Sequence, residues 1–421
     1  MARSAVPSNR PAEPAEPIAI TGIGPMLPGA FAVPPFWNNL RTGSSQLGRI
    51  DLGEGLGVCV GAQLGPFEVQ EVLPGLSARH AAKYSREILA TMASIKSAWQ
   101  DTGLDEAGID PRRVSIILSS SRGLPWRSRH ACNRADGTSG MLGSLTASPT
   151  NLTAIYLGAQ GLMTTISAAC VGGHHALGVA LRELRAGSSD AVLVGGYDFP
   201  LVPDVMGVFQ ELGLLSRERD QPGRAVRPYN RDRDGTALGE GAITLCLERV
   251  STVRARGARV YAHILDHQAL NEAGHATRMD LSGRMTADLL IRAVTEVGRS
   301  VDEIGYVCGH GTATRANDLA ECQALKALYP HRRAEELPPL GSNKPIYGHT
   351  LGAAGIINVA ATALMLHHQS LAPTINISDV DPDCAQDHVA DGPRPATLDL
   401  AVSLAFAIGS QTSVVILGAS A

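Results

Sequence analysis

Residues 164–181 read TTISAACVGGHHALGVAL, and this stretch indicates the fold. The preceding and overlapping residues 162–169 are mostly apolar or β-branched, which is typical of a strand buried in a parallel sheet that is covered on both faces. From Val171 toward Arg185 the pattern is that of a helix. Cys170 therefore lies where a buried strand passes directly into a helix, as in α/β proteins.

The same alternation of strands and helices continues along the chain. We expect further strands at residues 18–24, 114–120, 191–196, 304–311, 402–409 and 412–418, and one that begins within 258–266. We expect further helices at residues 86–100, 285–297, 319–328 and 351–367. Two comparable α/β halves that meet near residue 255 indicate an internal duplication. The predicted organisation is a disordered tail at 1–17, one half at 18–255 and a second at 256–421.

Composition and charge exclude several classes of protein. The chain has 421 residues, of which 44% are hydrophobic and 18% charged, so we expect an ordinary globular protein. A net charge of −4 gives no electrostatic reason to expect nucleic acid or an anionic membrane as a partner. No apolar run approaches the roughly 18 residues that span a bilayer. The first 17 residues have no apolar segment of a signal peptide, and the seven scattered cysteines have no zinc-site spacing, so we expect a reducing, cytoplasmic location.

Cys170 is a candidate nucleophile. A thiol at a strand-to-helix junction faces the positive end of the helix, which favours the thiolate. Gly172 and Gly173 have no side chains, so we expect them to leave room for a substrate near the sulfur. A single cysteine beside a strand is nevertheless more often a buried packing residue. His174 and His175 lie just beyond it on the expected helix, where we interpret them as structural residues.

Two histidines also stand at junctions between elements. His310 lies in GHGTATRAND (309–318) at the end of an apolar strand, and His349 lies in SNKPIYGHTLGAAG (342–355) at a Gly-rich turn that opens a helix. Sheet-based enzymes collect their chemistry at such junctions. Each histidine alone could be a core residue bonded to backbone. Together with Cys170 they place three reactive groups at three junctions, which favours a catalytic site.

With these residues, the chain resembles the β-ketoacyl synthases of type II fatty-acid and polyketide assembly. The resemblance runs from about Ile18 to Leu417, and its most specific parts are the Cys170 junction, RPYNRDRDGTALGEGA (227–242), GHGTATRAND with Glu321, and SNKPIYGHTLGAAG. It implies an α/β thiolase-like fold with duplicated halves in five layers, αβαβα. It also implies an elongating enzyme, since the initiating condensing enzymes pair the cysteine with His and Asn.

The resemblance implies a decarboxylative Claisen condensation. An acyl chain would move from carrier-protein phosphopantetheine to Cys170, and the enolate formed from malonyl carrier protein would attack it. His310 and His349 would donate hydrogen bonds to the developing oxyanion, and Lys344 would orient them. Backbone N–H groups of Cys170 and Ile408 would hold the acyl oxyanion. The remaining expected site residues are Thr312 and Thr314 at the pantetheine arm, Phe406 and Thr236 at the acyl pocket, and Asp318, Glu321 and Asn358 in the supporting network.

The sequence departs from the family pattern at three places. Ile408 stands where a gating phenylalanine is usual, with Ala407 and Ser410 in place of glycines. Thr236 also replaces a phenylalanine, which suggests a roomier or differently shaped acyl site. Asn358 stands where a glutamate is common, so Lys344 would lose an expected partner. These differences favour a specialised synthase over a housekeeping one.

Several alternatives stay open at the level of sequence. The chain could be an acyltransferase or cyclising enzyme that no longer decarboxylates malonyl groups, or the catalytic half of a heterodimer with a chain-length-factor-like subunit. A chain-length partner without catalysis is disfavoured by the complete set of Cys170, His310 and His349. A thiolase acting on free coenzyme A esters is disfavoured by His349 and by the lack of a matching second cysteine. The resemblance implies an acyl carrier protein as partner, a homodimer or heterodimer, and no bound metal or cofactor.

Overall fold

The computed structural model describes residues 16–53, 56–124 and 143–420. Its main feature is a ten-stranded mixed sheet with the order β11-β10-β14-β15-β9-β1-β8-β6-β4-β5. Its strands are β1 (Ile18–Met26), β4 (Val114–Ser119), β5 (Met163–Ile166), β6 (Ala191–Asp198), β8 (Gly241–Arg249), β9 (Ala262–Asn271), β10 (Ile304–Cys308), β11 (Leu340–Gly341), β14 (Leu400–Ala407) and β15 (Gln411–Gly418). The α/β fold class predicted from the sequence is confirmed.

The strand order repeats itself in the two halves of the sheet. In chain order, the first half contributes β1, β4, β5, β6 and β8, and the second contributes β9, β10, β11, β14 and β15. In each half the second strand pairs in parallel with the third and fourth, and the fifth pairs antiparallel with the fourth and first. Strands β1 and β9 join the halves. The structure thus confirms the duplication that the sequence indicated.

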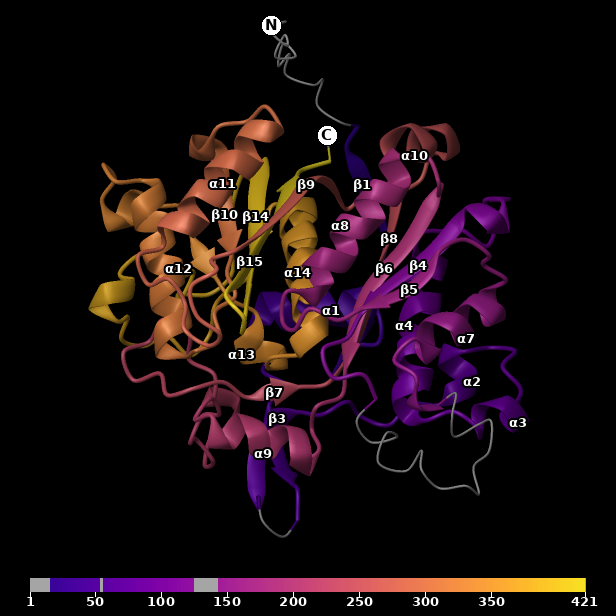
Figure 1. Ribbon diagram of the computed structural model, residues 1–421, viewed down its shortest axis with the longest axis horizontal. Helices are drawn as coiled ribbons and strands as arrows, with labels where there is room; N and C mark the ends of the chain where they lie inside the picture. The colour runs from indigo at the N-terminus through magenta and orange to yellow at the C-terminus, as the bar shows by residue number, and fades with distance from the viewer. Residues whose placement is uncertain (1–15, 54–55, 125–142, 421) are drawn as a thin grey trace, which may run out of the picture.

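Helices cover both halves and also fill the space between them. The main helices are α4 (Arg86–Asp101), α7 (Ser148–Leu157), α8 (Gly172–Arg185), α11 (Arg284–Glu296), α12 (Arg315–Leu328) and α14 (Ala354–His368). Figure 1 shows α8 and α14 in the middle, with α4 and α7 outside the first half and α11 and α12 outside the second. This is the five-layered αβαβα arrangement. The two central helices therefore occupy equivalent places in the duplicated halves.

Helix α14 is apolar all round because protein surrounds it on every side. Each of its residues from Ala354 to Leu366 is buried. Residues Leu351–His368 are long and apolar enough to cross a membrane by length and composition, yet 89% of that stretch is buried inside the protein. The sequence prediction that no apolar run approaches this length was wrong. The reason is that a central helix packed between two sheet layers needs the same uniform hydrophobicity as a membrane span.

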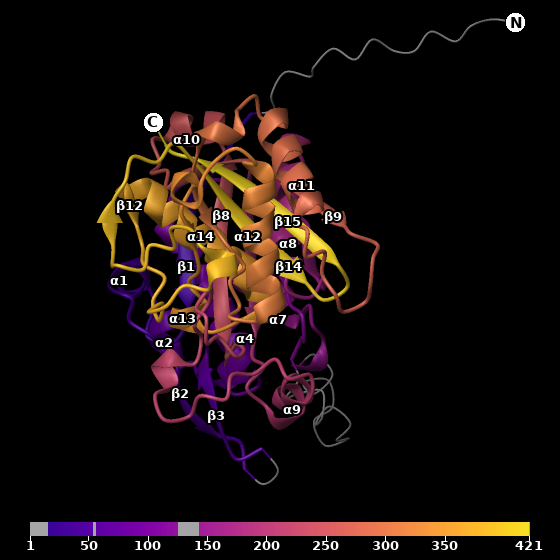
Figure 2. The same ribbon diagram turned by 90° about the vertical axis from the view of Figure 1, so that its left-hand side faces the viewer.

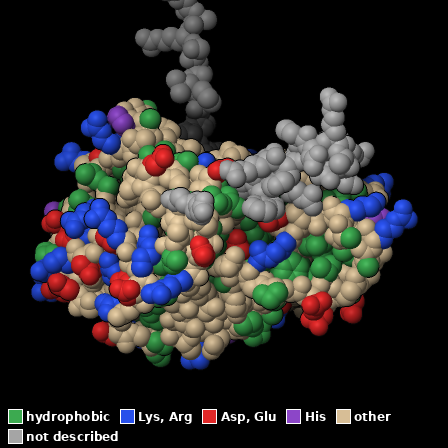
Figure 3. Space-filling view, turned by 90° about the horizontal axis from the view of Figure 1, so that it is seen from below, with side chains coloured by type: hydrophobic (Ala, Val, Ile, Leu, Met, Phe, Trp, Pro, Cys, Tyr) green, Lys and Arg blue, Asp and Glu red, His purple; other side chains and the backbone are tan. Residues whose placement is uncertain are grey.

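The remaining described elements are short. They include α1 (Val33–Thr42), α2 (Val69–Val72), α3 (Ala78–Ala81), α9 (Pro203–Glu211), α10 (Val250–Arg256), α13 (Lys344–Tyr347), the sheet of β2 (Gly48–Asp51), β3 (Val58–Ala62) and β7 (Leu238–Gly239), and the pair β12 (Ser370–Leu371) and β13 (Arg394–Pro395). Figures 1 and 2 place β3 and α9 at the end opposite the C-terminus. On that end, which Figure 3 views from below, positive and negative side chains are interspersed.

Two sequence predictions need correction or restriction. The run 162–169 was expected to be a buried strand, but β5 covers only Met163–Ile166, lies at the sheet edge and is half-buried. Strand β4 pairs with β5 on one side, and no strand of the described residues pairs with it on the other. The expected disordered tail at 1–17 lies outside the described residues except for Glu16 and Pro17, and the Glu16 carboxylate accepts a hydrogen bond from the backbone N–H of Ser251 at 2.7 Å.

Candidate active site

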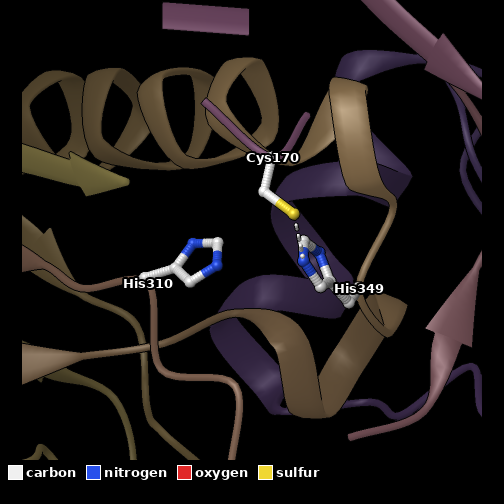
Figure 4. A group of neighbouring side chains, drawn as sticks. All are labelled: Cys170, His310 and His349. Carbon is white, nitrogen blue, oxygen red and sulfur yellow. Dashed lines mark hydrogen bonds between the residues drawn. The ribbon is translucent and has the colours of Figure 1, made fainter. Parts of the chain in front are cut away.

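The three predicted reactive residues meet at one point between the halves. Cys170 lies between β5 and the start of α8, His310 follows β10, and His349 lies in the turn that leads to α14. The sulfur of Cys170 and one ring nitrogen of each histidine all lie within 4.8 Å of one another. Figure 4 shows both imidazole rings facing the sulfur, with His349 on one side and His310 on the other. Residues 179 positions apart in the sequence therefore form one cluster.

The cluster lies in a cavity of about 310 Å³. Its walls come from both halves and include side chains of the loop after β9 and of α9. Besides the three reactive residues, it is lined by Phe209, Leu214, Thr236, Thr277, Arg278, Met279, Leu281, Thr312, Thr314, Ala316, Asn317, Phe406, Ala407, Ile408 and Ser410. Most of these side chains are apolar, so the cavity suits a hydrophobic chain attached to the sulfur.

Hydrogen bonds fix the roles of the two imidazole rings. His349 Nδ1 accepts the backbone N–H of Leu351 at 3.3 Å, and Lys344 Nζ lies 3.5 Å from His310 Nδ1. Each Nδ1 therefore serves as an acceptor, so we assign the proton to Nε2 in both rings. Burial, reinforced by the charge of Lys344, lowers the pKa of both histidines well below the usual value. Both rings are consequently neutral at pH 7, and Nε2 of His349 lies 3.1 Å from the Cys170 sulfur.

The cysteine is a thiol in the resting site. Burial raises the pKa of Cys170 to about 11, the charges of Lys344 and Arg122 lower it, and Asp198 raises it. The start of α8 adds the positive end of a helix next to the sulfur. The sequence predicts that the helix start lowers the Cys170 pKa. It does not predict how strongly burial raises that pKa, since burial depends on the folded surroundings. The thiolate is therefore a minor species near neutral pH.

Lys344 is a buried cation beneath the histidines. Its side chain is 1% exposed, and its ammonium donates to the carbonyl oxygen of His310. Burial lowers the pKa of Lys344, and the charge of Glu321 opposes that effect. Among the charged groups around Lys344, Glu321 opposes the effect of burial on the lysine pKa most strongly. Asn358 was expected to leave Lys344 without a carboxylate partner, and the influence of Glu321 on the lysine was not part of that expectation.

The acidic part of the network is held by the block 227–242. Glu321 accepts hydrogen bonds from the backbone N–H of Gly311 at 2.7 Å and from the Tyr229 hydroxyl at 3.2 Å. Asp318 accepts the backbone N–H of Tyr229 at 2.9 Å and lies 3.4 Å from the Arg233 guanidinium. Because both acids are fully buried, burial raises the pKa of each. The structure places these predicted network residues directly behind the segment that carries His310.

Asn358 connects three segments through its amide group. Its Nδ2 donates to the carbonyl oxygens of Gly309 at 3.1 Å and Leu404 at 3.3 Å. Its Oδ1 accepts from the Asn343 side chain at 3.1 Å. Gly309 precedes His310 and Asn343 precedes Lys344, so this amide braces the backbone on both sides of the histidine–lysine contact. A glutamate would offer no donor to these carbonyl groups unless it were protonated.

The predicted pocket residues all line the cavity. The hydroxyl groups of Thr312 and Thr314 lie 2.8 Å apart, and the ring of Phe406 packs edge-on against His310 at 6.3 Å between centroids. Thr236 is 3% exposed, whereas Ile408 is 51% exposed. Ile408 is therefore the more accessible of the two positions at which the sequence lacks a family phenylalanine.

The glycines after Cys170 have a different purpose from the expected one. A Cβ on Gly172 would lie 2.3 Å from the Ser119 hydroxyl of β4, and one on Gly173 would lie 3.0 Å from the backbone N of Ile356 in α14. They allow α8 to pack closely against β4 and α14 rather than clearing space for a substrate. His174 is fully buried, with Nε2 3.0 Å from the Ser403 hydroxyl. That contact agrees with a structural role.

Several non-glycine residues at the site have left-handed backbone conformations. Ala169 precedes Cys170 with φ 47°, Ala313 separates Thr312 and Thr314 with φ 63°, and Leu351 follows the His349 turn with φ 49°. Such conformations cost free energy and persist where surrounding contacts enforce them. The turns that carry the reactive groups are therefore held in place by tertiary packing.

Sequence reasoning missed three parts of the site. The α9 side chain Phe209 lines the cavity, and the fully buried Asp198 influences the Cys170 pKa. The cavity is also lined by four residues of the loop after β9: Thr277, Arg278, Met279 and Leu281. The loop and helix residues carry no local pattern that separates them from ordinary surface segments. The sequence did carry a signal for Asp198. It follows the apolar run 191–196 and Tyr197 directly, and a charged residue at the end of a buried strand is unusual.

Comparison with known proteins agrees with this geometry. The family model of the β-ketoacyl synthase N-terminal domain matches residues 15–252, and that of the C-terminal domain matches residues 261–378. The tetracenomycin polyketide synthase ketoacyl synthase alpha subunit of Streptomyces glaucescens is 31% identical over 413 residues, covering 95% of this chain and 96% of that protein.

Solved structures show the same relationship. A type II polyketide synthase ketosynthase in complex with its acyl-carrier protein has a TM-score of 0.87 at 26% identity, covering 96% of this chain and 100% of that one. The ishigamide ketosynthase/chain length factor has a TM-score of 0.86 at 26% identity, covering 97% and 100%. Both likenesses extend over the whole described fold and confirm its thiolase-like architecture. The chain belongs to the β-ketoacyl synthase family of condensing acyltransferases.

Proposed function

We propose that this chain is an elongating β-ketoacyl-acyl-carrier-protein synthase in which Cys170 carries the acyl group. The observation that supports this most directly is the convergence of two neutral imidazole rings on one thiol. His310 and His349 both keep a proton on Nε2, and both rings face the Cys170 sulfur. Two neutral donors suit stabilisation of a thioester enolate, whereas a charged imidazolium would protonate it.

The first half-reaction transfers the acyl group to the enzyme. The Cys170 thiolate attacks the acyl thioester carbon, the carbon–sulfur bond to phosphopantetheine breaks, and the pantetheine thiolate takes up the proton that Cys170 lost. We assign the tetrahedral oxyanion to the backbone N–H groups of Cys170 and Ile408, which border the same cavity. No redox change occurs in this exchange.

The second half-reaction forms the new carbon–carbon bond. The bond between the α-carbon and the carboxylate of the malonyl group breaks, which releases CO₂. The two electrons of this bond form an enolate, whose oxygen accepts Nε2–H hydrogen bonds from His310 and His349. The enolate carbon attacks the Cys170 thioester, and collapse of that intermediate releases the Cys170 thiolate and a β-ketoacyl carrier protein. Lys344 acts from behind by donating to the backbone of His310, which holds that ring in place.

The substrate arm is the phosphopantetheine of an acyl carrier protein, and we propose no bound cofactor. Thr312 and Thr314 lie on the cavity wall, with hydroxyl groups that can reach the amides of the arm. Phe406 and Thr236 border the part of the cavity that receives the acyl chain. Asp318, Glu321 and Asn358 support the lysine and the first histidine from behind.

We also propose that a second subunit covers the edge of the sheet at β5. This strand pairs with β4 on one side and is the last strand of the ten-stranded sheet. Leu145, Ile155 and Leu162 near this edge are 46%, 79% and 40% exposed. No strand of the described residues pairs with the outer side of β5, and a free sheet edge with apolar neighbours favours association. A homodimer and a heterodimer with a chain-length-factor-like subunit both fit, and the likeness to a ketosynthase/chain length factor supports the second.

The departures from the family pattern support a role in specialised polyketide or fatty-acyl biosynthesis. Ile408 and Thr236 replace larger aromatic rings at a cavity of about 310 Å³. A survey of acyl carrier substrates tests this proposal. Preference for branched, unsaturated or polyketone chains is expected, and a preference for ordinary saturated chains would contradict it.

Two further expectations stay proposals. We propose that the chain divides into an N-terminal half at 18–255 and a C-terminal half at 256–421, which the repeated strand order supports. We also propose a cytoplasmic location, supported by the six described cysteines, all of which are free.

Intact-protein mass spectrometry with acyl and malonyl carrier proteins tests the proposed reaction. Wild type should gain the acyl mass, and Cys170→Ala should not. Wild type should then release a β-ketoacyl carrier protein, and His349→Ala should retain acylation without that product. Acylation without CO₂ loss in wild type would instead identify a non-decarboxylating acyltransferase.

A further inference from the structure

Asp198 is a fully buried carboxylate at the end of β6 that receives four hydrogen bonds. Its Oδ1 accepts from the Ser120 hydroxyl and the Arg122 backbone N–H, both at 2.9 Å. Its Oδ2 accepts from the backbone N–H of Ser121 at 2.9 Å and of Gly352 at 2.7 Å. The carboxylate of Asp198 therefore accepts from three backbone N–H groups and one hydroxyl group.

These four donors come from both halves of the fold. Ser120, Ser121 and Arg122 form the turn after β4 in the first half, whereas Gly352 lies in the turn between His349 and α14 in the second. The two turns also touch directly, because a Cβ on Gly352 would lie 2.7 Å from the Ser121 backbone N and 2.8 Å from Asp198 Oδ2. Only a residue without a side chain fits at this position. Asp198 thus bonds one half of the site to the other.

The second turn controls the orientation of His349. Leu351, next to Gly352, donates its backbone N–H to His349 Nδ1 and has a left-handed φ of 49°. That conformation is unfavourable for leucine and requires contacts that enforce it. The hydrogen bond from Gly352 to Asp198 is such a contact. It anchors the turn at the residue directly after the one that fixes the imidazole tautomer.

We propose that Asp198 is a positioning residue for the condensation reaction, whose carboxylate holds the His349 turn against the first half so that Nε2–H of His349 stays directed at the Cys170 site. This inference rests on the proposed function for its effect on turnover. Its effect on the His349–Cys170 pair does not depend on the substrate. Asp198 acts through His349 and does not itself line the cavity.

The charge of Asp198 matters as well as its shape. Burial raises the pKa of Asp198 to about 6, while its backbone hydrogen bonds act in the opposite direction. Near pH 8 the carboxylate is ionised and accepts all four bonds. An asparagine retains one oxygen but places an amide where two donors now point, so at least one backbone N–H loses its partner.

The main test is a double-mutant cycle on malonyl decarboxylation at pH 8. We expect Asp198→Asn to lower the rate constant about 10- to 100-fold in the wild-type background, while KM for malonyl carrier protein changes less than threefold. In a His349→Ala background the same substitution should change the rate less than threefold, because the residue it acts through is absent. Equal factors in both backgrounds would show that Asp198 acts independently of His349 and would overturn the proposal.

Two variants keep the test decisive if Asp198→Asn folds poorly. Gly352→Ala pushes the His349 turn away from Asp198 from the other side and should reproduce the loss of decarboxylation. Glu248→Gln removes another fully buried carboxylate, which bonds Thr21 and Arg256 at the far end of β8. It should lower thermal stability and leave decarboxylation within twofold of wild type. A loss of activity in Glu248→Gln as large as in Asp198→Asn would attribute the effect to stability alone.

A second readout separates this inference from the proposed function. The rate at which iodoacetamide alkylates Cys170 depends, without any substrate, on the His349–Cys170 contact and on the charge of Asp198, which raises the Cys170 pKa. The charge effect is the same with and without His349, so only an effect through the contact makes the rates non-additive. The wild type and the three variants of the cycle should give non-additive alkylation rates even if the wild type decarboxylates no malonyl carrier protein. In that event the synthase proposal fails while the positioning role stands. Additive alkylation rates would reject the positioning role.

Discussion

The two halves of the molecule share one strand order and present different chemistry to the same cavity. In the first half β5 leads through Cys170 into the central helix α8. In the second half the short strand β11 leads through the His349 turn into the equivalent helix α14. Duplication has thus supplied two equivalent helix starts, and one carries a nucleophile whereas the other carries a hydrogen-bond donor.

The bonds that brace these turns differ in polarity for a physical reason. In the first half the carboxylate of Asp198 receives backbone N–H groups. In the second half the amide of Asn358 donates to the carbonyl oxygens of Gly309 and Leu404. A buried brace must match the backbone groups that it meets, so N–H groups select an anion and carbonyl groups select an amide donor. The two halves share a strand order, but their bracing side chains, Asp198 and Asn358, must therefore differ.

The largest expected effect comes from the nucleophile of the first half. Cys170→Ala should abolish acylation, since no other described cysteine lines the cavity. Intact-protein mass spectrometry measures this loss. The matched control is Cys59→Ala, which removes a buried cysteine from β3 and should leave the acyl mass gain intact. Acylation of the Cys170→Ala protein would place the nucleophile elsewhere.

The next effect comes from the donor of the second half. His349→Ala should lower condensation about 100- to 1000-fold, as expected when one oxyanion donor is lost. Acylation of Cys170 should fall far less, because the thiol and the start of α8 remain. Separate measurements of acyl transfer and of β-ketoacyl product distinguish these steps. If both steps fell by the same factor, the division of labour between the halves would be wrong.

A smaller effect is expected from the buried cation. Lys344 lowers the Cys170 pKa from beneath the site, so Lys344→Met should raise that pKa and slow Cys170 alkylation at fixed pH about three- to tenfold. In wild type the pKa is about 11, so alkylation should rise about tenfold per pH unit between about pH 7 and pH 9. The control is Lys326→Met, which removes a half-buried lysine of α12 that lies outside the cavity, and it should leave this profile unchanged.

The smallest expected effect concerns the brace of the second half. Asn358→Asp would place a carboxylate against two carbonyl oxygens and should lower the free energy of unfolding by about 2 to 4 kcal/mol. Urea unfolding measures the change. Asn38→Asp, on the exposed face of α1, is the control and should change the free energy by less than about 0.5 kcal/mol. Equal stability of both variants would contradict the polarity argument.

Sequence patterns predicted α4, α8, α11, α12 and α14, five of the six main helices, within a few residues, because their apolar faces follow a helical period. The helix expected at 86–100 is α4 at Arg86–Asp101, and the one expected at 285–297 is α11 at Arg284–Glu296. Prediction failed where an element's surroundings decide its burial. The run 162–169 has the composition of a buried strand, yet β5 lies at an edge that its own chain leaves half-exposed.

The sequence by itself determined most strands of the main sheet, five of the six main helices, the duplication and the identity of Cys170, His310 and His349 as candidates, since local periodicity and motif spacing carry that information. Only the tertiary structure decided that Glu321 raises the pKa of the buried Lys344, that Gly172 serves close helix packing, and that Asp198 joins the halves. These facts depend on contacts between residues far apart in the chain. Burial and hydrogen-bond partners arise from that three-dimensional arrangement, and local sequence does not specify them.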